Sequence, residues 1–156
     1  MAEPRDPLFE YRLRRRVQFH ETDAAGIVHF TAFFRYMEEA EHALWREAGL
    51  SIAPPGSAIG WPRQAASFDY HRALHFEDEL EICIRIATIE ERTIRYVCEI
   101  TKDAKRIATG TLTIVCVNKR PGEAMKAMPI PPEIAARFRE APVSDGVPQP
   151  ALEERS

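Results

Sequence analysis

Two carboxylates and a histidine lie within four residues of one another in the segment HETDAAGIVHF, residues 20–30. They are His20, Glu21 and Asp23. A carboxylate can attack a carbonyl carbon, or it can prepare a water molecule to do so. The small residues that follow, 24–26, would let a ligand approach the backbone closely. The combination is typical of acyl transfer, although the pattern does not choose between the two carboxylates, and a plain turn or cap remains the alternative role.

The residues after this segment have the period of an amphipathic helix. From Thr31 to Ala48, apolar residues recur at steps of three and four, and charged residues provide most of the opposite face. Thr31 is a candidate N-cap, and Gly49 suits the left-handed position that closes a helix. A helix start presents unpaired N–H groups and a partial positive charge. A carbonyl oxygen placed there would be polarised, and the negative charge that develops during attack would be stabilised.

A strand is predicted before the chemical segment, from Tyr11 to Phe19, by the partial alternation of its residues. Its apolar face, which includes Phe19, has one exception, Arg15. The opposite face carries three further arginines, Arg12, Arg14 and Arg16. We interpret them as a solvated, charged strand face. The alternative is a patch for the phosphates of a nucleotide-bearing substrate.

Four further strands are predicted after the helix, within residues 64–72, 80–86, 93–100 and 107–117. Short segments at 90–92 and 102–105 are natural hairpin connections. Residues 51–62 are expected to be loop, and 129–138 can start a short helix. The order of strand, long helix and four strands in a meander predicts an α+β fold, in which an antiparallel five-stranded sheet wraps around one long central helix. We expect a single domain over residues 1–140 and a mobile C-terminal tail over 141–156.

Composition restricts the classes of function. The chain has 156 residues, 45% of them hydrophobic, and a net charge of −3. A nucleic-acid-binding domain would usually be strongly basic. No apolar run approaches the ~20 residues of a membrane span, and the N-terminus lacks the apolar core of a signal peptide. The three cysteines, Cys83, Cys98 and Cys116, are interpreted as small buried hydrophobes. A cytoplasmic protein with no nucleic-acid or membrane partner is therefore expected.

Residues 17–50, VQFHETDAAGIVHFTAFFRYMEEAEHALWREAGL, resemble the opening of hotdog-fold acyl-CoA thioesterases of the 4-hydroxybenzoyl-CoA thioesterase type. The hallmark of that family is an aspartate followed by a small or proline residue, a small residue, glycine, two aliphatic residues, an aromatic pair and the central helix. The matching positions run from Asp23 to Phe30. The strand–helix–four-strand order is also the family's, so the resemblance covers about Tyr11 to Pro132.

The resemblance implies an enzyme that hydrolyses an acyl-CoA thioester and requires no metal or redox cofactor. Asp23 matches the catalytic aspartate, which acts as nucleophile or general base. The backbone N–H of Phe30 matches the donor that polarises the carbonyl, and Gly26 sits in what looks like the family's tight turn. Ala25 and His29 are expected to lie against the substrate. Members of the family are dimers or tetramers with the thioester at a subunit interface, so a homodimer or homotetramer is expected.

Two positions depart from the family pattern. His29 stands where an aromatic residue is commoner, and Phe30 stands where relatives carry Tyr or His. Such side chains are expected to line the pocket, so the identity of the acyl group does not follow from the resemblance.

Arginines outside the motif are candidates for contacts with the CoA phosphates. Arg72, with Arg63 and Arg85, could bind them through bidentate hydrogen bonds. Ordinary surface arginines are the alternative interpretation. Three glutamates lie on the predicted helix, and another branch of the fold uses a helical glutamate for catalysis. Because the loop aspartate is present, we interpret Glu38, Glu39 and Glu41 as a solvated face.

A metal site is not expected from the histidines. His71 and His75 are four residues apart but lie at a strand end and in a turn, without a third ligand in register. His20, Glu21 and Asp23 are too cramped to supply three ligands from one short loop.

Two other functions remain open. A protein of the same fold could bind an acyl-CoA or a small aromatic ligand without turning it over. A hotdog hydratase or dehydratase would want a catalytic histidine paired with an acid near the site, which His20 or His29 could supply.

Overall fold

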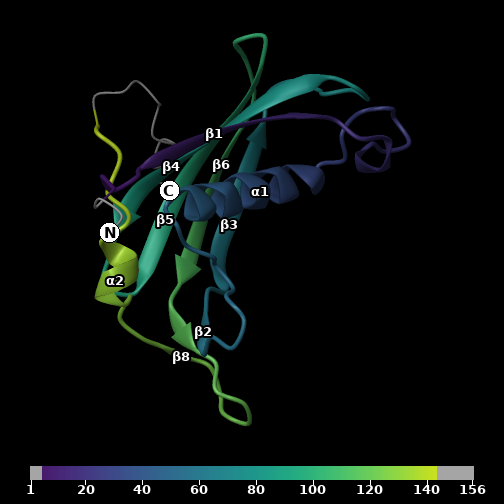
Figure 1. Ribbon diagram of the computed structural model, residues 1–156. Coiled ribbons are helices and arrows are strands. Elements are labelled where there is room, and N and C mark those ends of the chain that lie inside the picture. The colour runs from purple at the N-terminus through teal and green to yellow at the C-terminus, as the bar shows by residue number, and fades with distance from the viewer. Residues whose placement is uncertain (1–4, 144–156) are drawn as a thin grey trace, which may run out of the picture.

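The computed structural model describes residues 5–143, and a five-stranded antiparallel sheet dominates that range. The order of its strands is β1-β4-β5-β6-β3. Helix α1 (Ala32–Glu47) lies across one face of this sheet (Figure 1). The strands are β1 (Glu10–Arg16), β3 (Arg63–Tyr70), β4 (Glu79–Ile89), β5 (Thr93–Lys102) and β6 (Lys105–Val115).

A smaller sheet continues from the end where β6 finishes and β3 begins. Its order is β2-β7-β8, and its strands are β2 (Ile59–Gly60), β7 (Val117–Asn118) and β8 (Lys126–Ala127). Two short helices complete the described elements, the 3-10 helix η1 (Phe19–Glu21) and α2 (Pro132–Ala135). The short helix expected within 129–138 is thus confirmed as a single turn.

The predicted architecture, a five-stranded antiparallel sheet around one long helix, is confirmed, but one detail of the topology is wrong. The four later strands do not form one meander, because β3 pairs with β6 and not with β4. Residues 71–78 instead carry the chain from the β3 edge to β4, which lies between β1 and β5. This crossover passes the segment before α1, where Leu74 accepts a hydrogen bond from the Val28 N–H at 2.8 Å.

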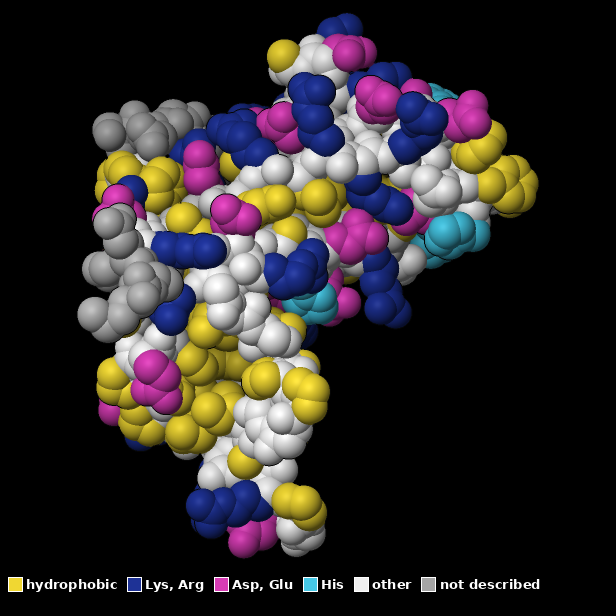
Figure 2. Space-filling model, viewed as in Figure 1, with side chains coloured by type: hydrophobic (Ala, Val, Ile, Leu, Met, Phe, Trp, Pro, Cys, Tyr) yellow, Lys and Arg dark blue, Asp and Glu magenta, His cyan; other side chains and the backbone are white. Residues whose placement is uncertain are grey.

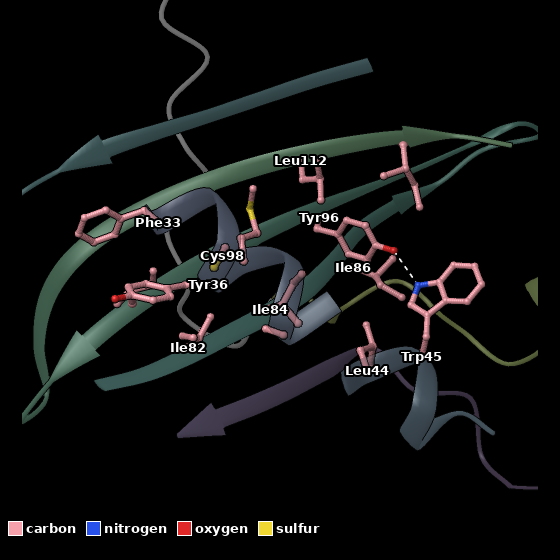
Figure 3. Packing of buried hydrophobic residues seen from close by; sticks show 14 of the residues in the cluster. Phe33, Tyr36, Leu44, Trp45, Ile82, Ile84, Ile86, Tyr96, Cys98 and Leu112 are labelled. Carbon is pink, nitrogen blue, oxygen red and sulfur yellow. Dashed lines mark hydrogen bonds between the residues drawn. The ribbon is translucent and has the colours of Figure 1, made fainter. Parts of the chain in front are cut away.

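The core forms between α1 and the inner face of the sheet. Trp45 from the helix donates its Nε1–H to the Tyr96 hydroxyl at 2.9 Å, so even this buried polar contact is satisfied (Figure 3). A fully buried large aliphatic or aromatic side chain contributes about 1.5–3 kcal/mol relative to an exposed one. The core therefore fixes α1 firmly on the sheet. Its largest fully buried members are Tyr36, Met37, Leu44, Trp45, Leu74, Ile82, Ile84, Ile86, Ile94, Tyr96, Ile100 and Ile114.

Two side chains differ from their predicted environment. Phe19 was expected on the buried strand face but is 74% exposed, because β1 ends at Arg16 and the chain turns into η1. Glu41 was expected in solvent but is fully buried. The helix directs it toward Arg63, whose guanidinium donates to its two carboxylate oxygens at 2.6 and 3.2 Å.

The structure also tests the predictions for the end of α1 and for the start of the C-terminal tail. Gly49 follows the helix with φ +81°, as predicted for the closing position. Ala141, at the start of the expected tail, donates its N–H to Ile86 at 2.8 Å. Residues 144–156 of that tail lie outside the described residues. Within residues 5–143, no helix is long and apolar enough to cross a membrane.

Candidate active site

Asp23 lies in a tight hairpin that connects η1 to the segment before α1. Its N–H donates to the Ile27 carbonyl at 2.8 Å, and its own carbonyl accepts from Gly26 at 3.0 Å. Gly26 has φ +79°, a conformation that glycine adopts without steric cost. The glycine predicted for a tight turn is therefore found in one.

The Asp23 carboxylate accepts hydrogen bonds from backbone N–H groups of its own hairpin. Oδ1 accepts from the Ala25 N–H at 2.8 Å and, more weakly, from the Ile27 N–H at 3.4 Å. Oδ2 has no hydrogen-bond partner among residues 5–143. The carboxylate thus acts as a turn former through one oxygen while the other is left without a protein donor, so both interpretations of this residue have a structural counterpart.

The backbone N–H of Phe30 is the other predicted chemical group, and its neighbours on the chain are all hydrogen bonded. The His29 carbonyl accepts from Ala32 at 2.9 Å, and the Phe30 carbonyl accepts from the Tyr70 hydroxyl at 2.7 Å. The Thr31 N–H donates to the His29 ring Nδ1 at 3.2 Å. The Phe30 N–H itself has no acceptor among the described residues. It is a fixed donor immediately before the first turn of α1.

Several aromatic side chains around this end of α1 are exposed. Phe30 is 61% exposed and its ring stacks on that of His29, with centroids 4.6 Å apart. Tyr70, at the end of β3, is 45% exposed and contacts the Phe33 ring edge-on. Figure 2 shows hydrophobic and histidine side chains open to solvent at this end of the molecule. An apolar surface of this kind, rimmed by polar groups, is typical of a binding site.

Glu21, the other carboxylate of the motif, is fully engaged. Its Oε2 accepts from Arg15 at 2.7 Å, and its Oε1 accepts from the Gln18 N–H at 2.7 Å and the Tyr36 hydroxyl at 3.1 Å. Burial by itself would raise the pKa of Glu21, but these hydrogen bonds and the Arg15 charge outweigh burial and hold the pKa below its usual range. Glu21 is an ion-pair partner with no free oxygen.

The candidate phosphate ligands separate into paired and unpaired arginines. Arg63 is paired with Glu41 and Glu38, and Arg85 with Glu10 at 2.9 Å. Arg72 is exposed, lies in the crossover, and donates its N–H to the Ile107 carbonyl at 3.1 Å, and it has no ion pair among the described residues.

The arginine-bearing face of β1 borders an open groove of about 780 Å³. Its cations are matched by carboxylates, since Arg16 pairs with Glu79 at 2.9 Å and Arg14 lies 3.5 Å from Glu81. The interpretation of a solvated, charged strand face therefore agrees better with the structure than the phosphate patch does.

The histidines of the other candidate sites are spread out. His71 is hydrogen bonded to the Thr109 hydroxyl at 3.1 Å, and His75 lies 3.7 Å from Asp78. His20 is exposed. Across residues 5–143, no three His, Cys, Asp or Glu side chains are grouped as metal ligands would be.

Three residues of this region were missed by the sequence argument: Arg15, Tyr36 and Tyr70. Arg15 did carry a signal, since it was the one charged residue on the apolar face of β1. Tyr36 and Tyr70 carried none, because each looks like an ordinary apolar position and its hydroxyl finds its partner only in the folded chain.

Comparison with known proteins gives consistent matches over most of the chain. Residues 17–138 match the family model of the thioesterase-like superfamily. The chain is 26% identical over 115 residues to the 1,4-dihydroxy-2-naphthoyl-CoA hydrolase of Synechococcus elongatus, and the alignment covers 71% of this chain and 84% of that protein. The structure is similar to that of a gentisyl-coenzyme A thioesterase, with a TM-score of 0.72, 27% identity, and coverage of 80% of this chain and 98% of that one.

A likeness at lower identity concerns the fold alone. A 4-hydroxybenzoyl-CoA thioesterase variant, solved with 4-hydroxybenzoyl-CoA, has a TM-score of 0.72 and 17% identity, and the match covers 81% of this chain and 96% of that one.

Proposed function

Because the chain belongs to the thioesterase-like superfamily, as the resemblance of its residues predicted, we propose that it hydrolyses an acyl-CoA thioester to the free acid and CoA. It is a hotdog-fold enzyme of the thioesterase family. Two groups in the segment between η1 and α1 carry the assignment to the site. One Asp23 carboxylate oxygen has no donor, and the Phe30 N–H has no acceptor, among residues 5–143.

In the proposed mechanism the thioester carbonyl oxygen accepts a hydrogen bond from the Phe30 N–H. The partial positive charge of the α1 start adds to this polarisation. Asp23 either takes a proton from an attacking water or itself attacks the carbonyl carbon, and the C–S bond then breaks with release of the CoA thiol. In the second route a water hydrolyses the resulting anhydride. Both routes end with the same acid and thiol.

Glu21 is a poor candidate for this role. Both of its carboxylate oxygens already accept hydrogen bonds, from Arg15, Gln18 and Tyr36, and its lowered pKa makes it a weaker base. We therefore assign the chemistry to Asp23.

The substrate would approach over the small residues of the hairpin and the exposed rings beyond them. Ala25 presents no side chain beyond its methyl group, and the His29–Phe30 stack offers a flat apolar surface to the acyl group. Arg72 follows the last residue of β3, Tyr70, by two positions and has no ion pair among the described residues, and we propose that it contacts a CoA phosphate. Relatives are named for aromatic acyl groups, so benzoyl-type thioesters head the panel of substrates to be tested.

We propose that the active form is a homo-oligomer in the cytoplasm, with a homodimer as its minimum. Among the described strands, β3 pairs with β6 alone, and seven of its eight residues are exposed. A long exposed edge of this kind is normally covered or paired. A second copy placed there would also cover the exposed Tyr70 ring. Sedimentation equilibrium tests the proposal, and a chain that is monomeric at its working concentration would contradict it.

The catalytic assignment is tested with Asp23→Asn. Asparagine keeps an oxygen that can accept from Ala25, so the hairpin should persist, and kcat should fall at least ~10²-fold with little change in KM. Asp103→Asn, an exposed aspartate in the β5–β6 turn, is the matched control and should leave kcat unaltered. An Asp23→Asn protein with full turnover would refute the assignment.

The same assay separates the rival functions. Thiol release is followed with benzoyl, phenylacetyl, short-chain and long-chain acyl-CoAs. Binding of these compounds without thiol release would favour a non-catalytic acyl-CoA-binding protein, and hydration of an enoyl-CoA would favour a hydratase.

A further inference from the structure

We propose that Arg15, Glu21 and Tyr36 form a positioning unit that holds the Asp23 hairpin in register with the start of α1. The proposal rests on the proposed function, in which Asp23 and the Phe30 N–H act on the same carbonyl. None of the three residues is expected to touch the substrate.

Arg15 is the central cation of this unit. Its side chain is 17% exposed and lies on the inner face of β1, where the strand pattern calls for an apolar residue. The guanidinium contacts three groups: Nη1 lies 2.7 Å from Glu21, Nε lies 3.2 Å from Glu39 on α1, and Cζ lies 4.5 Å above the centre of the Tyr36 ring. Arg15 thus joins the strand, the loop and the helix.

Glu21 connects this cation to both chemical groups. Its side chain binds Arg15 and the Tyr36 hydroxyl, while its backbone carbonyl accepts from the His29 N–H at 2.8 Å. Asp23 follows two residues later, and Phe30 follows His29 directly. A displacement of Glu21 would therefore move the base of the hairpin and the peptide next to the polarising amide together.

Stability alone does not account for an ion pair in this place. An apolar residue at position 15 would satisfy the buried strand face, and a buried ion pair is often no more stabilising than well-packed apolar residues. The partly buried pair of Arg15 and Glu21 does fix the distance and direction between the elements that carry it. Reacting groups must be held to within about an ångström, since a misplacement of ~1 Å can cost ~10²-fold in rate.

The test compares Glu21→Gln and Tyr36→Phe in the wild-type chain and in the Asp23→Asn chain. Glutamine keeps an acceptor for Gln18 and Tyr36 but loses the charge that binds Arg15. We expect Glu21→Gln to lower kcat by about 10-fold and Tyr36→Phe by about 3-fold, with KM changed by less than about 2-fold. In the Asp23→Asn chain, the loss from Glu21→Gln should be at least ~3-fold smaller, because the Asp23 carboxylate, one of the two groups that Glu21 positions, is gone.

Glu79→Gln is the matched control. This glutamate forms an ion pair at 2.9 Å with Arg16, the residue after Arg15 on the same strand, but 74% of its side chain is exposed on the outer face. The kcat of the Glu79→Gln variant should equal that of the wild type. Thermal unfolding of each variant reports whether the fold is retained.

The outcomes separate the two proposals. If Asp23→Asn keeps full turnover, the proposed function fails and the positioning role falls with it. If Asp23→Asn is impaired but Glu21→Gln is harmless, or costs the same factor in both backgrounds, the positioning role alone is overturned. Should Glu21→Gln not fold, the same comparison with Tyr36→Phe decides, because that change removes only one hydroxyl.

Discussion

Replacing Arg63 with methionine would leave the Glu41 carboxylate buried without its cation. Glu41 is fully buried on α1, and Arg63 is the first residue of the exposed edge strand β3. The guanidinium makes hydrogen bonds of 2.6 and 3.2 Å to the two Glu41 oxygens. Methionine keeps most of the side-chain length and removes only the charge and the donors.

The size of the loss follows from this geometry. Removing one partner of a buried ion pair costs about 3–5 kcal/mol, because the remaining charge is uncompensated. The Arg63 side chain is 30% exposed, so solvent screens part of the interaction and the lower end of that range applies. We expect the free energy of unfolding at pH 8 to fall by about 3 kcal/mol. For a chain of this length that corresponds to a drop in Tm of about 6–12 °C.

The loss should depend on pH. Burial raises the pKa of Glu41 above its usual range, even though the charge and hydrogen bonds of Arg63 lower it. An acid whose pKa is higher in the folded than in the unfolded state destabilises the fold as pH rises above the unfolded value, about 4.3. Without Arg63 the folded pKa rises further, so the deficit of the variant widens with pH. The deficit should therefore be smaller at pH 5 than at pH 8, because protonation neutralises the buried carboxylate and removes its need for a cation.

Urea denaturation at pH 5 and pH 8 measures both quantities. Arg35→Met is the control, since that arginine is on the same helix, is 81% exposed and lies 3.9 Å from Glu38, and its loss should cost less than about 0.5 kcal/mol. The double variant Glu41→Gln with Arg63→Met should recover much of the stability and lose the pH dependence. A deficit in Arg63→Met below ~1 kcal/mol at pH 8, or one that is equal at both pH values, would refute the reasoning.

Two further changes test the turn chemistry and the polarising amide. Ala104 has φ +63° in the β5–β6 turn, so Ala104→Gly should raise stability by about 1 kcal/mol in urea denaturation, and a loss of stability would contradict the strain assigned to this position. Tyr70→Phe removes the hydrogen bond to the Phe30 carbonyl while keeping the ring against Phe33, so kcat for thiol release should fall by about 2–10-fold with the fold intact; unchanged turnover would mean that this bond does not hold the amide.

The long elements of the fold were predictable because most of them have a clear local period, whereas η1, β2, β7 and β8 are too short to show one. The three-and-four spacing from Phe33 to Leu44 gave the helix to within a residue or two at each end, and alternation gave the strands after it. The pairing of β3 with β6 was not predictable, because alternation fixes which face of a strand is buried but says nothing about its neighbour. The exposure of Phe19 was missed for a related reason: the pattern continued for three residues after the strand had ended.

The parts of the candidate site that were predictable are those formed by backbone groups or by a local turn. The Asp23 hairpin, Gly26 and the helix start are contiguous in the chain, so the order of residues already describes them. The supporting ion pairs join segments that are distant in sequence, as Arg63 and Glu41 are, or that run on opposite sides of a turn, as Arg15 and Glu21 do.

Arg15 and Glu41 have one property in common in the folded chain. Each is a charged residue that the folded chain places on the buried side of its element, and each is paired there with a charge from another segment. A charge that breaks an apolar pattern costs free energy unless the fold supplies a partner, so a stable chain that retains one must contain that partner. The alternation of the strand showed the exception at Arg15 but could not identify Glu21 as its partner. The helical pattern did not distinguish the buried Glu41 from Glu38 and Glu39, which are partly exposed on the same helix. Buried charged residues are therefore the positions at which ion pairs connect β1, η1, α1 and β3. They are the first residues to test for an effect on the site without contact with the substrate.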